Sequence, residues 1–321
     1  MPTIHDPIAE FLRQVPVIIL DGALATELEQ RGANLDDPLW SAKVLLEQPQ
    51  MIRAVHRDYF EAGADIAITA SYQASFQGFA RRGLTASQTE RLLRTSVLLA
   101  AEARDDYLRQ SQRQAGSPPP RPSPLIAASV GPYGAALADG SEYRGGYALS
   151  DDALMAFHRP RLAVLTEAGA DLMACETVPS LREALVLAQL LEEFPHCCAW
   201  ISFSCRDGTQ TWEGQAIEDC ARALEAFPQI VSIGINCTRP EFIASLLRRM
   251  RAQTTKPLLA YPNSGETYDA ATKSWHGPAA AVPLAAHTLE WYGAGARLIG
   301  GCCRSRPADI RAIRQELQRC A

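Results

Sequence analysis

The chain has 321 residues, of which 47% are hydrophobic and 21% are charged, and its formal net charge at pH 7 is −5. This composition is too apolar for a disordered chain, and the length accommodates two average domains or one large α/β barrel. The acidic balance excludes bulk electrostatic attraction to nucleic acid or to an anionic membrane, so we expect neither as a partner.

The compartment is predicted from apolar runs and cysteine usage. Runs such as residues 16–20 fall far short of the ~20 residues that a membrane span needs. The first residues show no signal-peptide pattern, so we expect a cytoplasmic protein. The nine cysteines are then expected to be mostly thiols, and their odd number argues against complete pairing. The amphipathic stretches show no heptad pattern, which favours a monomer.

Eight short runs recur along the chain, and most are continuously apolar, as is typical of parallel strands covered on both faces. They are residues 17–20, 65–69, 125–130, 171–175, 199–204, 231–236, 257–261 and 297–301. Amphipathic stretches with helical spacing lie between them, among others 45–63, 87–104, 151–169 and 238–250. Eight strand–helix units predict one (β/α)₈ TIM-type barrel domain over residues 1–321, with a doubly wound open sheet as the alternative.

The junctions and insertions follow the same plan. Gly-Ala-Asp precedes a predicted strand at 63–65 and 169–171, and Gly-Ala-Arg at 295–297 is a looser copy. This repetition predicts that one helix-to-strand junction is rebuilt each time. The Pro-rich segment 114–124 leads into a strand, so we expect a loop without catalytic role. The insertions 133–147 and 264–277 follow strands, on the side where loops build the site of such barrels.

Polar residues follow most of the predicted strands, and a barrel brings these strand ends to one mouth. Burying polar groups there costs free energy unless they are used, so we predict that the set forms the functional site. The candidates are Asp21, Gly22 and Ala23 after the first strand, Thr69, Ser71 and Tyr72 after the second, Glu176 after the fourth, Asn236 and Cys237 after the sixth, and Cys302 and Cys303 after the eighth.

The three cysteines carry the sharpest chemical signal. One strand separates the sixth strand from the eighth in a barrel, so Cys237 can approach Cys302 and Cys303. Three soft ligands on two rigid strands suit Zn²⁺ and leave a fourth position for water or substrate. Gly300 and Gly301 would let the backbone turn tightly before the cysteine pair. The alternative is that vicinal thiols fill apolar space, which is our interpretation of residues 197–198 at the start of a strand.

The other polar candidates are more ambiguous. Glu176 could bind a cationic group, act as a general base, or form a structural salt bridge. Asp21 could bind substrate or stabilise a turn with Gly22, and His276 in the 264–277 insertion could reach the site. The sequence has no nucleophile elbow, dinucleotide fingerprint or P-loop, which disfavours acyl hydrolysis and nucleotide-dependent chemistry.

Seven motifs, in this order, resemble the homocysteine S-methyltransferase family from about residue 15 to about residue 312. They are DGALATELEQRG (21–32), AITASYQA (67–74), SVGPYGA (129–135), ACET (174–177), GINC (234–237), YPNSGE (261–266) and GGCCR (300–304). The segments 37–45, 138–145 and 261–266 resemble the bacterial branch that uses S-methylmethionine as methyl donor, whereas the betaine-using branch is more distant.

The resemblance implies a zinc-dependent (β/α)₈ barrel with Cys237, Cys302 and Cys303 as the zinc ligands. Glu176 would hold the ammonium group of homocysteine. The turn at Asp21, Gly22 and Ala23, with Thr69 and Ser71, would bind around the amino-acid carboxylate, and Tyr72 and Asn236 complete the predicted substrate-binding set.

The implied reaction moves a methyl group from S-methylmethionine, or from S-adenosylmethionine, to the homocysteine thiol and gives methionine. A free thiol has a pKa of ~8.5, and coordination to Zn²⁺ would deprotonate it at neutral pH. The leaving group is a neutral thioether, so no general acid is needed. Tyr72, Tyr133 and Trp40 are candidates for cation–π contact with the sulfonium.

Three alternatives remain. The donor could be betaine or another methylated cation. The vicinal cysteines could instead serve a thiol redox or zinc-buffering protein. A zinc hydrolase is disfavoured, because the sequence offers no evident base beside the metal.

Overall fold

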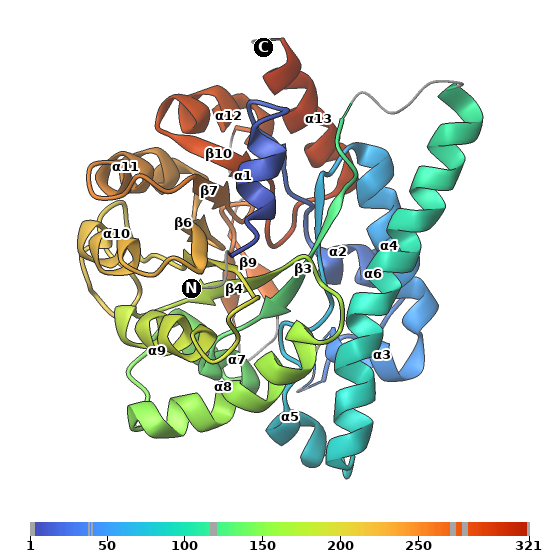
Figure 1. Cartoon of the computed structure of the whole chain (residues 1–321), viewed down its shortest axis with the longest axis vertical. Coiled ribbons are helices and arrows are strands. Elements are labelled where there is room, and N and C mark those ends of the chain that lie inside the picture. Colours follow the sequence, from blue (N-terminus) through green and yellow to red (C-terminus); the bar gives the residue numbers. More distant parts are fainter. Residues whose placement is uncertain are drawn as a thin grey trace.

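The computed structural model describes residues 4–37, 39, 41–115, 121–269, 274–277 and 282–319. Eight parallel strands surround a central axis in the order β1-β10-β7-β6-β5-β4-β3-β2 (Figure 1). A parallel bridge between Leu20 and Ile66 joins the two ends of this order, so the sheet closes into a barrel. The prediction of a (β/α)₈ barrel is confirmed, and the open doubly wound alternative is wrong.

Each barrel strand overlaps one of the eight apolar runs of the sequence. The strands are β1 (Ile18–Ile19), β2 (Ile66–Ile68), β3 (Leu125–Val130), β4 (Leu172–Val178), β5 (Ala199–Phe203), β6 (Ile230–Asn236), β7 (Leu258–Tyr261) and β10 (Ala296–Ile299). Strands β4, β5, β6 and β7 are buried along their whole length, because helices cover their outer face and side chains fill the barrel.

Helices surround the barrel (Figure 1). They are α1 (Pro7–Leu12), α2 (Leu24–Gln30), α3 (Ala42–Glu47), α4 (Pro49–Ala62), α5 (Phe76–Ala80), α6 (Ala86–Ala115), α7 (Tyr133–Leu137), α8 (Asp151–Thr166), α9 (Leu181–Leu191), α10 (Ile217–Glu225), α11 (Pro240–Arg251), α12 (Leu284–Gly293) and α13 (Pro307–Gln318). The amphipathic stretch 45–63 therefore belongs to two helices. Pro49 begins α4, since its ring cannot continue the preceding helix.

Two apolar clusters divide the core. The larger lies between the strands and the surrounding helices, and the smaller fills the barrel interior. Ile8 and Phe11 of α1 belong to the interior cluster, together with Trp200 and Tyr261. Trp200 Nε1 donates to Tyr261 Oη at 3.2 Å, so the bulky interior side chains are tied together below the carboxyl ends of the strands.

The repeated junction has a physical explanation. Gly63, Gly169 and Gly295 all have positive φ, between 86° and 110°, as a residue just after a helix commonly does. The Asp that follows two residues later accepts a backbone N–H from a neighbouring strand. Asp65 Oδ2 accepts from Ile19 N at 2.8 Å, and the equivalent aspartate at 171 accepts from the amide of residue 126 at 2.7 Å. The motif therefore stabilises the amino end of the barrel.

The third copy of the junction has Arg297 instead of aspartate. Its guanidinium lies 4.5 Å from the ring centroid of Tyr292, and Nη1 donates to the carbonyl of Ala296 at 2.8 Å. This copy therefore packs against its own preceding helix, which accounts for the looser sequence match.

The two insertions contain different secondary structure. Residues 133–147 contain α7 and the short 3₁₀ helix η1 (Ser141–Tyr143), and residues 264–277 include the antiparallel pair β8 (Thr267–Asp269) and β9 (Ser274–His276). Residues 116–120 of the Pro-rich segment lie outside the described residues. In the described part of the chain, no helix combines the length and apolar character that crossing a membrane requires.

Replacing Asp65 by Ala should destabilise the fold. The change leaves the amide of Ile19 and the guanidinium of Arg121, which donates to Asp65 Oδ1 at 2.7 Å, without their acceptor. We expect a loss of about 3 kcal/mol in the free energy of unfolding, measured by urea denaturation. The matched control is Asp105→Ala, whose carboxylate is 54% exposed. A loss for Asp65→Ala no larger than for the control would contradict this role.

Candidate metal centre and substrate pocket

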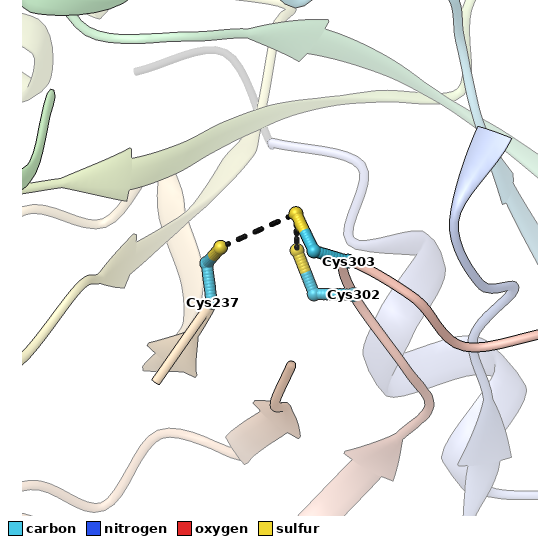
Figure 2. Close-up of side chains that lie close together, drawn as sticks. All are labelled: Cys237, Cys302 and Cys303. Atoms are coloured by element: carbon cyan, nitrogen blue, oxygen red, sulfur yellow. Dashed lines mark hydrogen bonds between the residues drawn. The ribbon is translucent and has the colours of Figure 1, made fainter. Parts of the chain in front are cut away.

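Three cysteine sulfurs meet at the carboxyl ends of β6 and β10. Cys237 Sγ lies 3.5 Å from Cys303 Sγ, Cys302 Sγ lies 3.9 Å from Cys303 Sγ, and all three lie within 4.8 Å of one another (Figure 2). Sulfurs that bind one tetrahedral Zn²⁺ with bonds of about 2.3 Å lie about 3.8 Å apart. The cluster therefore fits a tetrahedral metal ion that prefers sulfur.

The backbone around the cluster adopts unusual conformations. Thr177 and Cys237 have φ of 60° and 46°, in the left-handed region that residues other than glycine rarely enter. Asn236 at the end of β6 bonds to Thr177 in β4 and contacts Cys302 after β10. Its Oδ1 accepts from Thr177 N at 2.7 Å, and its Nδ2 donates to Thr177 Oγ1 at 2.7 Å and lies 3.9 Å from Cys302 Sγ. Such outliers concentrate at functional sites, where the surrounding structure holds them.

Gly300 and Gly301 are needed for close approach and do not have positive φ. A Cβ on Gly300 would lie 2.6 Å from Leu20 Cβ, and one on Gly301 would lie 2.3 Å from Ser305 Oγ. The glycine pair thus lets the chain pass closely beside β1 and the loop before α13. This passage places the cysteine pair opposite Cys237.

The pKa values of the three thiols are shifted in different directions. Hydrogen bonds from Cys302 and Cys303 lower the pKa of Cys237 well below its usual value, and the same bonds raise the pKa of Cys302 and Cys303 well above theirs. Tyr143 Oη, 3.0 Å from Cys237 Sγ, further favours the thiolate of Cys237. One thiolate beside two thiols is an arrangement that a thiophilic cation would complete.

A cavity of about 1020 Å³, its open mouth included, adjoins the thiols. Glu176 lies in its wall, where Oε1 accepts from Ser129 Oγ and Oε2 accepts from Tyr261 Oη at 3.1 Å. Burial is the main cause that raises the pKa of Glu176 to about 8. Burial also raises the pKa of Asp21 well above its usual value, and the Glu176 charge adds to this. Two such carboxyl groups in one pocket favour a cationic ligand.

The structure brings most of the predicted site residues together. Those that line the cavity are Asp21, Gly22, Ala23, Thr69, Tyr72, Glu176, Cys237, Cys302 and Cys303. Ser71 and Asn236 are buried outside this lining. Ser71 Oγ lies 2.8 Å from Thr69 Oγ1 and donates to the carbonyl of Ser129 at 2.7 Å. Both residues thus contact lining residues rather than the cavity.

The aromatic candidates are distributed differently. Tyr72 lines the cavity, whereas Tyr133 is outside the lining and packs edge-on against Tyr147 and Phe157, with ring centroids 5.2 and 5.0 Å away. His276 is exposed in β9 and does not line the cavity, and Trp40 lies outside the described residues.

Among the residues of the cavity wall that sequence reasoning missed, three bear on the chemistry of the site. Gln73 follows β2, and Glu142 and Tyr143 belong to η1. Only the length and position of the 133–147 insertion pointed to this region, and no motif in it marked these side chains.

A second loop supports this wall. Residues 204–216 follow β5, and Glu213 Oε1 accepts from the backbone amide of Gly146 at 2.6 Å. The ring of Trp212 stands edge-on to Tyr143, with centroids 6.2 Å apart. Ser204 Oγ donates to the carbonyl of Glu142 at 3.3 Å. The loop therefore holds η1 beside the thiols.

Comparison with known proteins agrees with this geometry. The family model "Homocysteine S-methyltransferase" matches residues 18–317. The chain belongs to this family. It is 54% identical to the homocysteine S-methyltransferase YbgG of Bacillus subtilis, with 96% of each chain covered, and 47% identical to a selenocysteine Se-methyltransferase of Brassica oleracea, with 93% and 88% covered. The metallated form of the homocysteine methyltransferase MmuM of Escherichia coli superposes with a TM-score of 0.85 at 48% identity, covering 97% of this chain and 99% of that one.

Replacing Glu213 by Ala should loosen the cavity wall without disturbing the barrel. Removing the acceptor of the Gly146 amide is expected to speed amide hydrogen exchange in residues 141–147, because Gly145 and Gly146, with φ of 68° and 69°, have few other conformational constraints. Mass spectrometry of exchange measures this effect. Glu193→Ala, which removes a surface partner of Arg159, is the control. If the amide exchange rate in residues 141–147 equals that of the control variant, Glu213 does not hold this segment in place.

Proposed function

We propose that the protein transfers a methyl group from S-methylmethionine to the thiol of homocysteine, forming methionine, with Zn²⁺ held by Cys237, Cys302 and Cys303. The observation that carries this proposal is the group of three sulfurs within 4.8 Å of one another in the wall of a cavity that also contains buried carboxyl groups. Family membership supports the reaction class.

The donor set favours zinc over other metals. Three thiolates and a tetrahedral spacing suit Zn²⁺, whereas Mg²⁺ and Ca²⁺ prefer oxygen ligands. When bound, Zn²⁺ is a Lewis acid that stabilises the acceptor thiol as its nucleophilic thiolate at neutral pH. Strands β6 and β10, which both pair with β7, hold the sulfurs rigidly, and Asn236 fixes the backbone beside them.

Glu176 is the proposed partner of the homocysteine ammonium group. Hydrogen bonds from Ser129 and Tyr261 orient its carboxyl group, and the described residues that line the cavity include no cationic side chain. A charge-assisted hydrogen bond of this kind is worth about 1.5–3 kcal/mol. Asp21 is a second buried carboxyl group in the same cavity lining.

The carboxylate of homocysteine is proposed to bind at the turn before α2. Gly22 and Ala23 form the turn before α2, and the positive end of a helix dipole favours an anion there. Thr69 lies beside this turn in the cavity lining, and Ser71 supports Thr69 from below.

The donor brings a positive charge to a cavity with an acidic wall. Glu142, Tyr143 and Tyr72 line the side next to Cys237. Methyl transfer needs the acceptor sulfur, the methyl carbon and the leaving sulfur in line, so positioning by the wall supplies much of the catalysis. The leaving group is a neutral thioether, and in keeping with this no histidine occurs among the described lining residues. We further propose that the protein acts as a monomer in the cytoplasm.

Metal analysis and a methylation assay test the proposal together. Purified protein should contain about one Zn²⁺ per chain and should form methionine from homocysteine and S-methylmethionine. The Cys302→Ser variant should lose both the metal and methionine formation. Cys197→Ser is the matched control, since Cys197 is a half-buried thiol before β5, away from the cavity. Full activity in metal-free protein would refute the proposal, and zinc binding without methionine formation would favour a buffering role.

A further inference from the structure

Two buried oxygens next to the cavity have no hydrogen-bond partner among the described residues. They are Gln73 Oε1 and Glu142 Oε2. Both residues line the cavity and are more than nine-tenths buried, with 8% and 7% of their surfaces exposed. A buried acceptor without a donor costs free energy, so a cavity whose lining retains two of them has a use for them.

The short helix α7 bonds to the side chain of Gln73 and packs against the backbone of Glu142. Gln73 Nε2 donates to the carbonyl of Ala135 at 3.2 Å. Because a carbonyl can only accept, this bond sets the orientation of the amide and leaves Oε1 as a free acceptor. Gly134 packs on η1 so closely that a Cβ there would lie 2.5 Å from Glu142 N. Adjacent residues of α7 thus hold Gln73 and Glu142.

Glu142 has no ion-pair partner among the residues that the structure describes. In the described part of the chain, the nearby guanidinium of Arg144 pairs with Asp139 at 3.6 Å and is 62% exposed. Burial raises the pKa of Glu142 to about 7, which reflects a carboxylate that is poorly compensated inside the protein. A cation supplied by a ligand would remove this penalty.

We propose that Gln73 and Glu142 form the subsite for the α-ammonium group of the methyl donor, so that the donor is a sulfonium amino acid. This inference rests on the proposed function and specifies its donor class. A primary ammonium has three N–H donors and can satisfy both oxygens, including the neutral Gln73 amide. A sulfonium centre or a quaternary ammonium has no N–H and leaves Gln73 Oε1 unpaired. The subsite therefore selects against betaine.

The position of the subsite suits this role. Glu142 directly precedes Tyr143, whose Oη lies 3.0 Å from Cys237 Sγ. A donor whose ammonium group contacts Glu142 therefore binds next to the residue that contacts the Cys237 thiol. Glu176, with its bonds to Ser129 and Tyr261, remains for the ammonium group of the acceptor. The cavity thus offers separate ammonium positions for two amino-acid substrates.

Calorimetric titration of the zinc-loaded protein without homocysteine tests the subsite, because no methyl transfer takes place. The two probes are S-methylmethionine and dimethylsulfoniopropionate, a sulfonium carboxylate without an ammonium group. Gln73→Leu and Glu142→Gln should each weaken binding of S-methylmethionine about 10-fold or more. Gln73→Leu should change binding of dimethylsulfoniopropionate less than 3-fold, about the usual context-dependence of a single contact. Gln253→Leu and Glu193→Gln, both at the surface, are the matched controls.

Several outcomes would overturn the subsite. Equal losses for both probes in Gln73→Leu would mean that Gln73 does not bind the ammonium group. Unchanged binding of S-methylmethionine, or a rise in the homocysteine KM without weaker donor binding, would place these residues elsewhere in the reaction. If Gln73→Leu does not fold, Gln73→Glu retains the acceptor and should bind S-methylmethionine at least as tightly as the wild type; weaker binding would contradict the proposal. Protein that binds S-methylmethionine through these residues but forms no methionine would refute the proposed function and leave the subsite standing.

Discussion

The site depends on the lateral pairing of three barrel strands. Strand β7 lies between β6 and β10, pairing Asn236 with Tyr261 on one side and Ala260 with Ile299 on the other. This register ends the two outer strands at the same level, so Cys237 faces Cys302 and Cys303 across the end of β7. Without closure and this register, sulfurs separated by more than 60 residues in the sequence would not meet.

Charge balance links the proposed metal centre with the proposed substrates. The thiolate of Cys237 and the carboxyl groups of Asp21, Glu176 and Glu142 all lie at one cavity, where burial opposes their ionisation. Such a group of acids is costly unless cations enter. A metal ion, the ammonium groups of two amino acids and a sulfonium are cations of the required kind. The free-energy cost of burying these acids together therefore favours the binding of cationic ligands.

The barrel and the sulfur cluster were predictable from the sequence for a physical reason. Parallel strands covered on both faces are continuously apolar, and their carboxyl ends must converge, so the position of a residue just after a strand determines its neighbourhood. The repeated Gly-Ala-Asp junction was also predictable from the sequence. Gly63 and Gly169 have positive φ, and the aspartates accept hydrogen bonds from neighbouring strands, so each junction needs the same residues.

Side-chain direction and loop conformation were not predictable in this way. Ser71 and Asn236 lie at the ends of strands, yet their side chains bond to residues of β3 and β4 and do not line the cavity. Tyr133 begins a helix that turns it towards Phe157. Gln73, Glu142 and Tyr143 reach the cavity only because α7 and the loop 204–216 hold them, and such contacts between distant segments have no local sequence signal.

The most direct test of the account is X-ray absorption at the zinc edge of the purified protein. The three cysteines should appear as about three sulfur neighbours at about 2.3 Å from the metal, and replacing Cys237 by Ser should remove one of them. A shell made mainly of nitrogen and oxygen, or one that the Cys237→Ser variant leaves unchanged, would contradict a metal centre built on these thiols.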